Sequence, residues 1–178
     1  MSMHPLRNYF KEFPNEIFIE TGSYHGGGIM YALDAGFQHI ISVDQDKNNL
    51  LICKERFEAL GVIDKIQLVH GNSGEQLPKI LSTIDKPCTF WLDAHGQFFD
   101  FESQTENLFP LFEELSSIAG HHIKTHTILI DDILHLTHPD VTGWDRNKIE
   151  AAIKQINPLY KIEYRSNPVM NNILIASC

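Results

Sequence analysis

The sequence has few positive charges, few cysteines and no long apolar run. It carries 14 Lys and Arg against 23 Asp and Glu, a formal net charge of −9. Binding of nucleic acid irrespective of sequence needs a basic surface, so we expect no nucleic-acid partner. No apolar run approaches the length of a membrane span, and residues 1–16 lack the apolar stretch of a signal peptide. We therefore expect no membrane partner.

Cysteine usage and length narrow the class of protein further. Cys53, Cys88 and Cys178 are odd in number and widely spaced, without a CxxC pair. This pattern favours reduced thiols and a cytoplasmic location. The chain also lacks internal repeats and linkers, and 178 residues suit one hydrophobic core. We expect a single domain over residues 1–178, in which residues 1–16 form a short N-terminal extension.

The chain does contain a regular alternation of apolar and amphipathic segments from residue 17 to about residue 157. Strands are expected at residues 17–20, 39–43, 66–70, 89–92 and 127–130. Helices are expected at residues 27–35, 46–60, 74–81, 107–119 and after Asp145. Two more strands, 160–165 and 173–177, predict a hairpin and hence one antiparallel strand. The pattern predicts an α/β fold with a mostly parallel sheet and helices on both faces.

Several residues mark the ends of the expected helices. Asp46, Ser73 and Asp145 are expected to cap the helices that follow them, and Gly36 to end the first helix. Pro110 would have to lie in the first turn of the helix at 107–119, where its missing N–H is tolerated. Segments 94–106 and 133–144 have no clear period and are expected to be irregular.

Acidic residues follow four of the expected strands, at the point where each strand ends. They are Glu20, Asp44, Asp93 and the pair Asp131-Asp132. Because ligands of open α/β sheets bind outside the carboxyl ends of the strands, these acids predict a site at that edge. The alternative is that they cap helices or keep the surface soluble.

The stretch Glu20-Thr21-Gly22-Ser23-Tyr24-His25-Gly26-Gly27-Gly28 joins the first strand to the first helix. Glycine allows a ligand to approach the backbone, and the helix N-terminus offers free N–H groups. An ordinary glycine-rich turn is the alternative interpretation. The spacing differs from the dehydrogenase fingerprint GxGxxG, because Gly22 is followed by Ser23, Tyr24 and His25.

This stretch resembles the first motif of the class I S-adenosylmethionine-dependent methyltransferases, acid-x-Gly-x-x-x-Gly-x-Gly. The resemblance covers about residues 16–178. It implies a Rossmann-like fold with a seven-stranded sheet in the order 3-2-1-4-5-7-6, with the antiparallel hairpin at its end. It also implies S-adenosylmethionine as the cofactor.

The resemblance assigns cofactor-binding roles to residues at the carboxyl ends of the strands. Glu20 would lie beside the methionine end of the cofactor, and Asp44 would hold both ribose hydroxyls, as a carboxylate can. The remaining cofactor-binding residues implied by the motif are Gly22, Ser23, Gly26, Gln45, Asn72, Ser73 and Asp93. For Asp44 the alternative is a cap for the helix that follows.

A second group of acids follows the fourth and fifth strands. Asp93, Asp131 and Asp132 would repel one another unless a cation or protons lie between them. Carboxylates suit Mg²⁺ or a similar hard ion. This group resembles the metal site of the macrocin-type (sugar) O-methyltransferases. Solvated loop acids are the alternative.

In those enzymes a further Asp, two residues after the first, is the general base, and here His95 occupies that position. Histidine is a suitable base near neutral pH. A role for His95 as a metal ligand or in positioning the substrate is equally open.

The resemblance implies divalent-metal-assisted O-methylation of a small hydroxylated acceptor, such as a sugar or a natural product. Two alternatives stand beside it: a degenerate methyltransferase-like binding module, and an NAD-dependent oxidoreductase. Residues 1–16 leave little chain for a lid over the site. A second copy in a homo-oligomer, or the segment 94–106, would then cover it.

Other side chains have two interpretations each. Phe98, Phe99 and Phe101 either pack on the following helix or stack on an acceptor. His135 and His138 either reach the metal or are solvated. At the opposite edge of the sheet, we expect structural or surface roles for His121, His122 and His126.

Overall fold

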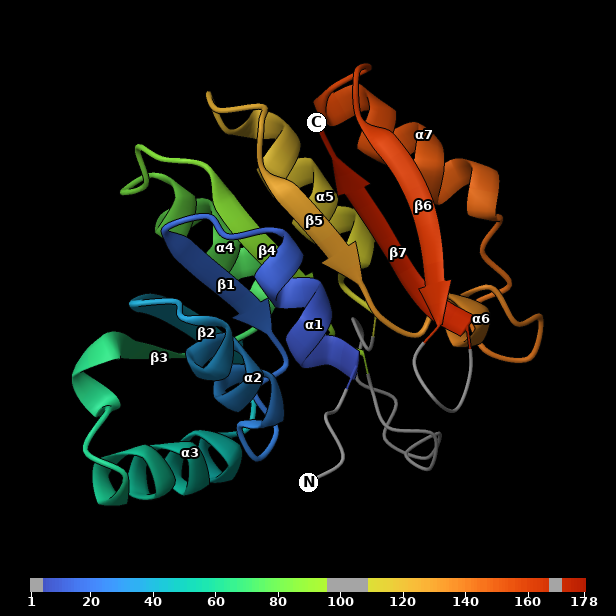
Figure 1. Cartoon of the computed structure of the whole chain (residues 1–178). Helices are drawn as coiled ribbons and strands as arrows, with labels where there is room; N and C mark the ends of the chain where they lie inside the picture. The colour runs from blue at the N-terminus through green and yellow to red at the C-terminus, as the bar shows by residue number, and fades with distance from the viewer. Residues whose placement is uncertain (1–4, 96–108, 167–170) are drawn as a thin grey trace.

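The computed structural model describes residues 5–95, 109–166 and 171–178. In these residues a central sheet lies between two layers of helices (Figure 1). Its strands are β1 (Ile17–Thr21), β2 (His39–Asp44), β3 (Ile66–His70), β4 (Cys88–Leu92), β5 (Thr127–Ile130), β6 (Lys161–Ser166) and β7 (Asn171–Ser177). The helices are α1 (Pro5–Glu12), α2 (Gly27–Ala35), α3 (Lys47–Ala59), α4 (Ser73–Leu81), α5 (Leu111–Gly120), α6 (Ile133–Leu136) and α7 (Arg146–Ile156), with a short 3₁₀ turn at Ile63–Lys65.

The seven strands follow the order β3-β2-β1-β4-β5-β7-β6. The first five are parallel, and β7 is antiparallel to both β5 and β6. The expected order and the C-terminal hairpin are thus confirmed. The chain builds outward from β1 to β3 and then crosses back to β4. The strand order therefore reverses between β1 and β4, where open α/β sheets bind their ligands.

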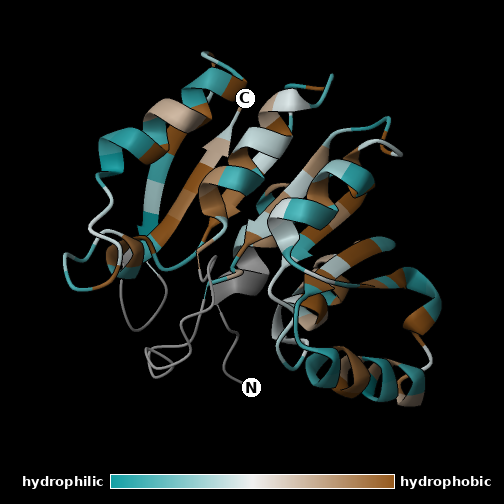
Figure 2. Ribbon diagram, turned by 180° about the vertical axis from the view of Figure 1, so that it is seen from behind, coloured by the Kyte–Doolittle hydropathy of each residue, from teal (hydrophilic) through white to brown (hydrophobic). Residues whose placement is uncertain are grey.

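Two apolar cores hold the layers together. Helices α1, α2 and α3 cover one face of the sheet, and α4, α5 and α7 cover the other (Figure 1). Alternate residues of one strand serve the two cores: Phe18 packs with the first set of helices and Ile19 with the second. On the side seen in Figure 2, the helices carry many hydrophilic residues on their outward surfaces. The period-2 and helical patterns of the sequence thus match the two buried faces.

Helix α1 lies within residues 1–16, which the sequence pattern predicts only as a short N-terminal extension. Phe10 in this helix is fully buried. Its ring centroid lies 4.8 Å from that of Phe18 and 5.3 Å from that of Trp91. Arg165 of β6 pairs with Glu12 at 2.5 Å. The helix is therefore part of the main core and is tied to the last strands of the sheet.

The helix ends agree with the expected caps at three places. The side chains of Asp46 and Asp145 accept hydrogen bonds from the backbone N–H two residues ahead, and Gly36 ends α2 in a left-handed conformation. The N-cap of α4, however, is Asn72. Ser73 does not cap it, because it lies inside the first turn and its hydroxyl is directed to another helix.

Two helices differ from the expected boundaries. Pro110 is the N-cap of α5 and not part of its first turn, so the helix begins at Leu111. Segment 133–144, which lacks a clear period, contains the single-turn helix α6. A turn this short is too brief to show helical periodicity in the sequence.

Cys53, Cys88 and Cys178 are free thiols, as expected. Among the described residues no helix has the length and apolar character needed to cross a membrane.

Candidate active site

The glycine-rich loop after β1 is pressed against two neighbouring parts of the chain. Gly22 has φ 85°, and a Cβ at this position would lie 2.4 Å from the carbonyl oxygen of Asp93. Gly26, the N-cap of α2, has φ 78°, and its Cβ would lie 2.7 Å from the ring of Phe57. Both positions therefore require glycine for conformation as well as for space. The loop is fixed between helix α3 and the chain that leaves β4.

Glu20 lies beneath this loop, with 1% of its surface exposed. The Ser42 hydroxyl donates to Glu20 Oε2 at 2.5 Å and lies 2.6 Å from the Ser23 hydroxyl. Burial raises the pKa of Glu20 to about 8; the bond from Ser42 opposes this shift and Asp44 adds to it. A Cβ on Gly28 would lie 1.9 Å from Glu20 Oε1. Glu20 therefore supports the loop and the start of α2 from inside the protein.

Asp44 connects the end of β2 to the same loop. Its carboxylate accepts hydrogen bonds from the backbone N–H groups of Tyr24 and Asp46, both at 2.8 Å, and from the Asn49 side chain at 3.2 Å. A carboxylate offers about four lone-pair sites, so about one stays free for a ligand. The cap of α3 is Asp46, so Asp44 is not itself the helix cap.

Three more of the expected cofactor-binding residues, Gln45, Asn72 and Ser73, face different directions. Gln45 is exposed, and its carbonyl accepts a hydrogen bond from His70 Nε2 at 3.1 Å. Asn72 stands at the start of α4. Ser73 is buried and donates to Glu114 Oε1 of α5 at 2.5 Å. Of these three, Gln45 and Asn72 lie where a ligand could reach them, and Ser73 points into the protein.

No sequence pattern indicates a role for Glu114, because its partners are remote in the chain. Burial raises the pKa of Glu114 to about 7, whereas hydrogen bonds from Ser73 and Thr21 lower it. It also contributes to the wall of a small cavity beside His95, which is otherwise lined mainly by apolar side chains such as Leu92 and Phe109. The volume of this cavity, about 10 Å³, is no more than a single water molecule needs.

The acids after β4 and β5 are held in register beyond the ends of their strands. The Asp93 N–H donates to the Thr21 carbonyl at 3.1 Å, and the Asp131 N–H donates to the Leu92 carbonyl at 3.2 Å. Burial raises the pKa of Asp93 well above its usual range, and Asp131 and Asp132 add to the shift. Burial and the neighbouring Asp132 raise the pKa of Asp131 to about 7. The protein thus gathers carboxylates that oppose one another's ionisation.

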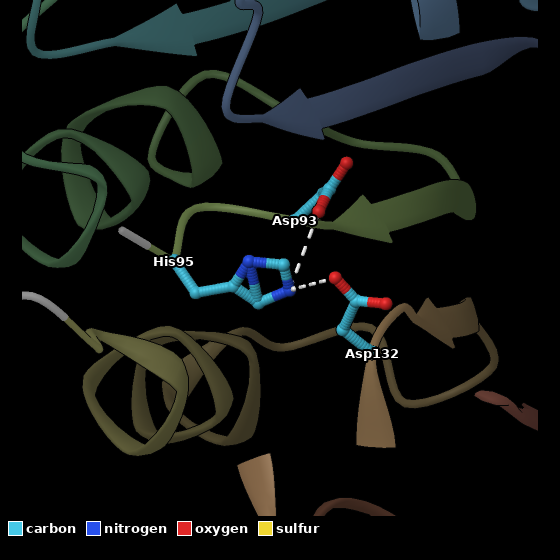
Figure 3. A group of neighbouring side chains, drawn as sticks. All are labelled: Asp93, His95 and Asp132. Atoms are coloured by element: carbon cyan, nitrogen blue, oxygen red, sulfur yellow. Dashed lines mark ion pairs between the residues drawn. The ribbon is translucent and has the colours of Figure 1, made fainter. Parts of the chain in front are cut away.

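His95 projects between two of these carboxylates (Figure 3). Its Nε2 lies 3.4 Å from Asp93 Oδ1 and 3.5 Å from Asp132 Oδ2. One ligand atom from each of these three residues lies within 4.8 Å of the other two. The Nε2 atom is buried and has no hydrogen-bond partner among the described residues. Burial lowers the pKa of His95, although Asp132 opposes the shift.

Asp131 is directed elsewhere. Its Oδ1 accepts the backbone N–H of Asp132 at 2.8 Å. Within the described ranges the group that could hold a metal ion consists of Asp93, His95 and Asp132. Of the three acids expected as ligands, the structure thus brings two together around His95 and leaves Asp131 beside them.

Asp132 is held in an unusual conformation. Its φ of 51° is in the left-handed region, which costs energy for residues other than glycine and is enriched at functional sites. Asn172 of β7, which is buried, donates to Asp132 Oδ1 at 3.4 Å and accepts the backbone N–H of Leu134. Sequence reasoning missed Asn172, since nothing in the pattern of β7 connects it to β5.

His135 and His138 differ in their surroundings. His135 is buried, and its ring centroid lies 6.2 Å from that of His95. His138 is exposed and lies 3.8 Å from Asp140. Phe98, Phe99 and Phe101 fall outside the described residues.

The histidines at the opposite edge of the sheet form a closed hydrogen-bonded chain. The Cys88 N–H donates to His126 Nδ1 at 3.0 Å, so the proton of this ring is on Nε2. That proton bonds to His121 Nδ1 at 2.9 Å, and His121 Nε2 bonds to the Ile84 carbonyl at 3.1 Å. Every ring nitrogen is satisfied in a neutral ring, so these residues are structural. His122 is exposed beside them.

No protein-family model matches the sequence, and no curated protein matches it. Solved structures do match. The methyltransferase PaMTH1 of Podospora anserina, bound to S-adenosylhomocysteine, is 13% identical, with a TM-score of 0.66 over 97% of this chain and 75% of that one. TomG of Streptomyces achromogenes, an O-methyltransferase involved in tomaymycin synthesis, was solved with S-adenosylmethionine. It is 11% identical, with a TM-score of 0.66 over 97% and 77% of the two chains.

The fold is that of the class I methyltransferases. The same fold occurs in a protein of Clostridium thermocellum assigned as an rRNA methylase, which is 12% identical, with a TM-score of 0.69 over 96% of this chain and 92% of that one. At identities this low the likeness concerns the class I methyltransferase fold, and chemistry has to be argued from the site.

Proposed function

We propose that the protein is an S-adenosylmethionine-dependent O-methyltransferase that activates its acceptor at a divalent cation. The observation that carries this proposal is the contact between the two parts of the site. Gly22 of the glycine-rich loop has room for no side chain, because the carbonyl of Asp93 lies against it. A methyl donor on the loop and a cation at Asp93 would therefore be neighbours.

The cofactor side of the proposal divides the expected residues into two kinds. Gly22, Ser23 and Gly26 would present the loop backbone to the cofactor, and the free lone pair of Asp44 would accept a ribose hydroxyl. Gln45, Asn72 and Asp93 would complete the contacts at the sheet edge. Glu20 and Ser73, which point inward, would act by holding the loop and α4 in place. PaMTH1 and TomG, solved with the product and the donor respectively, support the choice of cofactor.

The residues on the other side fit a divalent cation. Two carboxylates and a buried imidazole nitrogen without a hydrogen bond converge within ligand reach of one another. A cation bound there would lower the pKa of a coordinated acceptor hydroxyl. Asp93 and Asp132 would hold it, with Asp131 adjacent. His95 would either coordinate the cation or take the acceptor's proton.

The protein's contribution to the transfer is mainly orientation. The acceptor oxygen would form a bond to the methyl carbon as the carbon–sulfur bond breaks, and the acceptor proton would leave to a base. Such transfer needs the reacting atoms held about 3–3.5 Å apart. The acceptor we propose is a small hydroxylated molecule, such as a sugar or a natural product, because the net charge of −9 disfavours a nucleic acid.

Calorimetric titrations with S-adenosylmethionine, NAD and a short RNA test this proposal. We expect binding of S-adenosylmethionine and of neither other ligand. Asp44→Asn should weaken this binding by roughly 10–100-fold, the loss expected for a hydrogen bond to a charged group. Asp46→Asn, which changes the neighbouring helix cap, is the matched control and should leave the affinity within about twofold.

Two results would contradict the proposal. Binding of NAD without S-adenosylmethionine would show an oxidoreductase. Binding of S-adenosylmethionine with no methyl transfer to any of a panel of sugars and phenols, in the presence of Mg²⁺ or Mn²⁺, would favour the degenerate binding module.

A further inference from the structure

His95 carries a nitrogen atom in an unusual position. Only 11% of its side chain is exposed, and Nε2 itself is buried without a hydrogen bond among the described residues. Buried polar atoms nearly always have a partner, and one without a partner requires an explanation, of which a bound ion is one. The atoms nearest to Nε2 that could partner it are carboxylate oxygens of Asp93 and Asp132.

The two distances argue against a direct ion pair. A protonated ring nitrogen would draw a carboxylate to about 2.7–2.9 Å. Here both oxygens stay at 3.4 and 3.5 Å, on either side of the same nitrogen. Ligand atoms that share one tetrahedral ion at about 2.1 Å are roughly 3.4 Å apart. Both distances from Nε2 therefore match those between ligands of a common ion, and oxygens of Asp93 and Asp132 lie within 4.8 Å of each other.

We infer that Asp93, His95 and Asp132 form a mixed nitrogen and oxygen site that selects a first-row transition-metal dication, such as Co²⁺, Mn²⁺ or Zn²⁺, over Mg²⁺. Imidazole suits transition metals, whereas Mg²⁺ prefers oxygen ligands in octahedral geometry and gives up water reluctantly. The inference rests on the cation site of the proposed function and gives His95 the role of ligand. The nitrogen that faces the two carboxylates is then not available to take the acceptor's proton.

The surroundings of the three side chains support a preformed site. Asn172 donates to the second oxygen of Asp132, which fixes the orientation of the ligating carboxylate. The ring of His135 packs nearly perpendicular to that of His95, with an interplanar angle of 86°. The left-handed backbone of Asp132 is maintained at a cost in energy, which a bound ion would offset.

The test uses the whole chain, stripped of metal with a chelator and titrated with Co²⁺, Mn²⁺ and Mg²⁺ separately. Calorimetry gives the affinities. Pulsed electron paramagnetic resonance of bound Mn²⁺ detects a directly coordinated ¹⁴N nucleus. His95→Asp, which converts the site to oxygen ligands only, is the informative variant. His138→Ala is the matched control, because this nearby histidine is exposed and lies beside Asp140.

We expect Co²⁺ to bind at least about 100-fold more tightly than Mg²⁺ in the unchanged protein, with one ¹⁴N coupling to Mn²⁺. In His95→Asp the coupling should disappear and the preference for Co²⁺ should fall at least about tenfold. His138→Ala should change neither.

Three outcomes would overturn the inference: no metal binding, Mn²⁺ bound without ¹⁴N coupling, or an unchanged preference in His95→Asp. Titration with S-adenosylmethionine on the same samples separates this result from the proposed function. Failure to bind S-adenosylmethionine would contradict the proposed function alone. The metal selectivity is measured without cofactor or acceptor, so it tests the cation site by itself.

Discussion

Strands β4 and β5 have buried histidines near both of their ends, and the two sets are used differently. Near the amino ends, His126 and His121 form a chain in which every ring nitrogen has a partner. Beyond the carboxyl ends, His95 Nε2 is buried without one. The residue type is the same, and both side chains are largely removed from solvent: His126 is fully buried, and 11% of the His95 side chain is exposed. What distinguishes a structural histidine from a candidate ligand is the accounting of its hydrogen bonds.

Burial also shifts the pKa values of the side chains at the two ends of the strands in opposite directions. At the carboxyl ends burial raises the pKa of acids, to about 8 for Glu20 and about 7 for Glu114 and Asp131. At the amino ends burial lowers the pKa of His126 to about 4, and the neighbouring His121 adds to the shift. The carboxyl ends of the strands therefore favour bound protons or cations, and the amino ends favour neutral imidazole rings.

The largest effect that we expect from this difference is a maximum in stability at mildly acidic pH. In metal-free protein the buried acids stabilise the fold below pH about 4.5, and this contribution is lost as pH rises through about 7–8. His126 acts in the opposite sense: its contribution is present above pH about 6.5 and is lost as pH falls through about 4. The free energy of unfolding should change by several kcal/mol, since each unit of pKa shift is worth about 1.4 kcal/mol.

Denaturant titrations between pH 4 and 9, with a chelator present, measure this profile. Glu20→Gln and Glu114→Gln should flatten the alkaline side and leave the acid side unchanged. Part of the alkaline loss should remain, because the pKa values of Asp93 and Asp131 are raised as well. An alkaline side as steep in both variants as in the unchanged protein would show that Glu20 and Glu114 are not among its causes.

The second effect concerns the amino ends. His126→Ala leaves the Cys88 N–H without an acceptor and opens a cavity beside Phe90. We expect it to lower the free energy of unfolding by about 2–4 kcal/mol. His122→Ala, the exposed neighbour, should change it by less than about 0.5 kcal/mol. Cation affinity should be the same in both variants. Weaker cation binding in His126→Ala would show that the histidines near the amino ends of the strands do influence the cation site at the carboxyl ends.

The third and smallest effect concerns the support of the cation ligands. Asn172→Ala removes the donor to Asp132 and the acceptor for Leu134. We expect cation affinity to fall by roughly 10–100-fold, the range for residues that orient a ligand. Ser177→Ala, at the far end of β7, is the control. Equal affinities in the two variants, measured by calorimetry with Mn²⁺, would mean that Asn172 does not orient Asp132.

Features with a local sequence pattern were predicted well. The alternation of strands and helices, the hairpin at the C-terminus and the capping acids Asp46 and Asp145 each depend on a few neighbouring residues. The convergence of acids at one edge follows from parallel strands alone. The strand order was implied by the resemblance, and the structure confirms it.

Features that depend on remote partners could not be predicted. Ser73 was expected to cap a helix, but its hydroxyl bonds to Glu114, 41 residues away. Phe10 is buried because Phe18 and Trp91 meet it across the sheet. Asn172 reaches Asp132 only because β7 is paired with β5. Each of these contacts is set by the packing of elements, which no local pattern encodes.

The carboxyl of Glu20 fills the space where Gly28 has no side chain. A side chain at position 28 and a glutamate at position 20 therefore exclude each other sterically. A homologue with a side chain at position 28 would need a shorter residue at position 20, such as Asp or Ser. Paired exchange at these two positions, eight residues apart, would then preserve the packing beneath the loop.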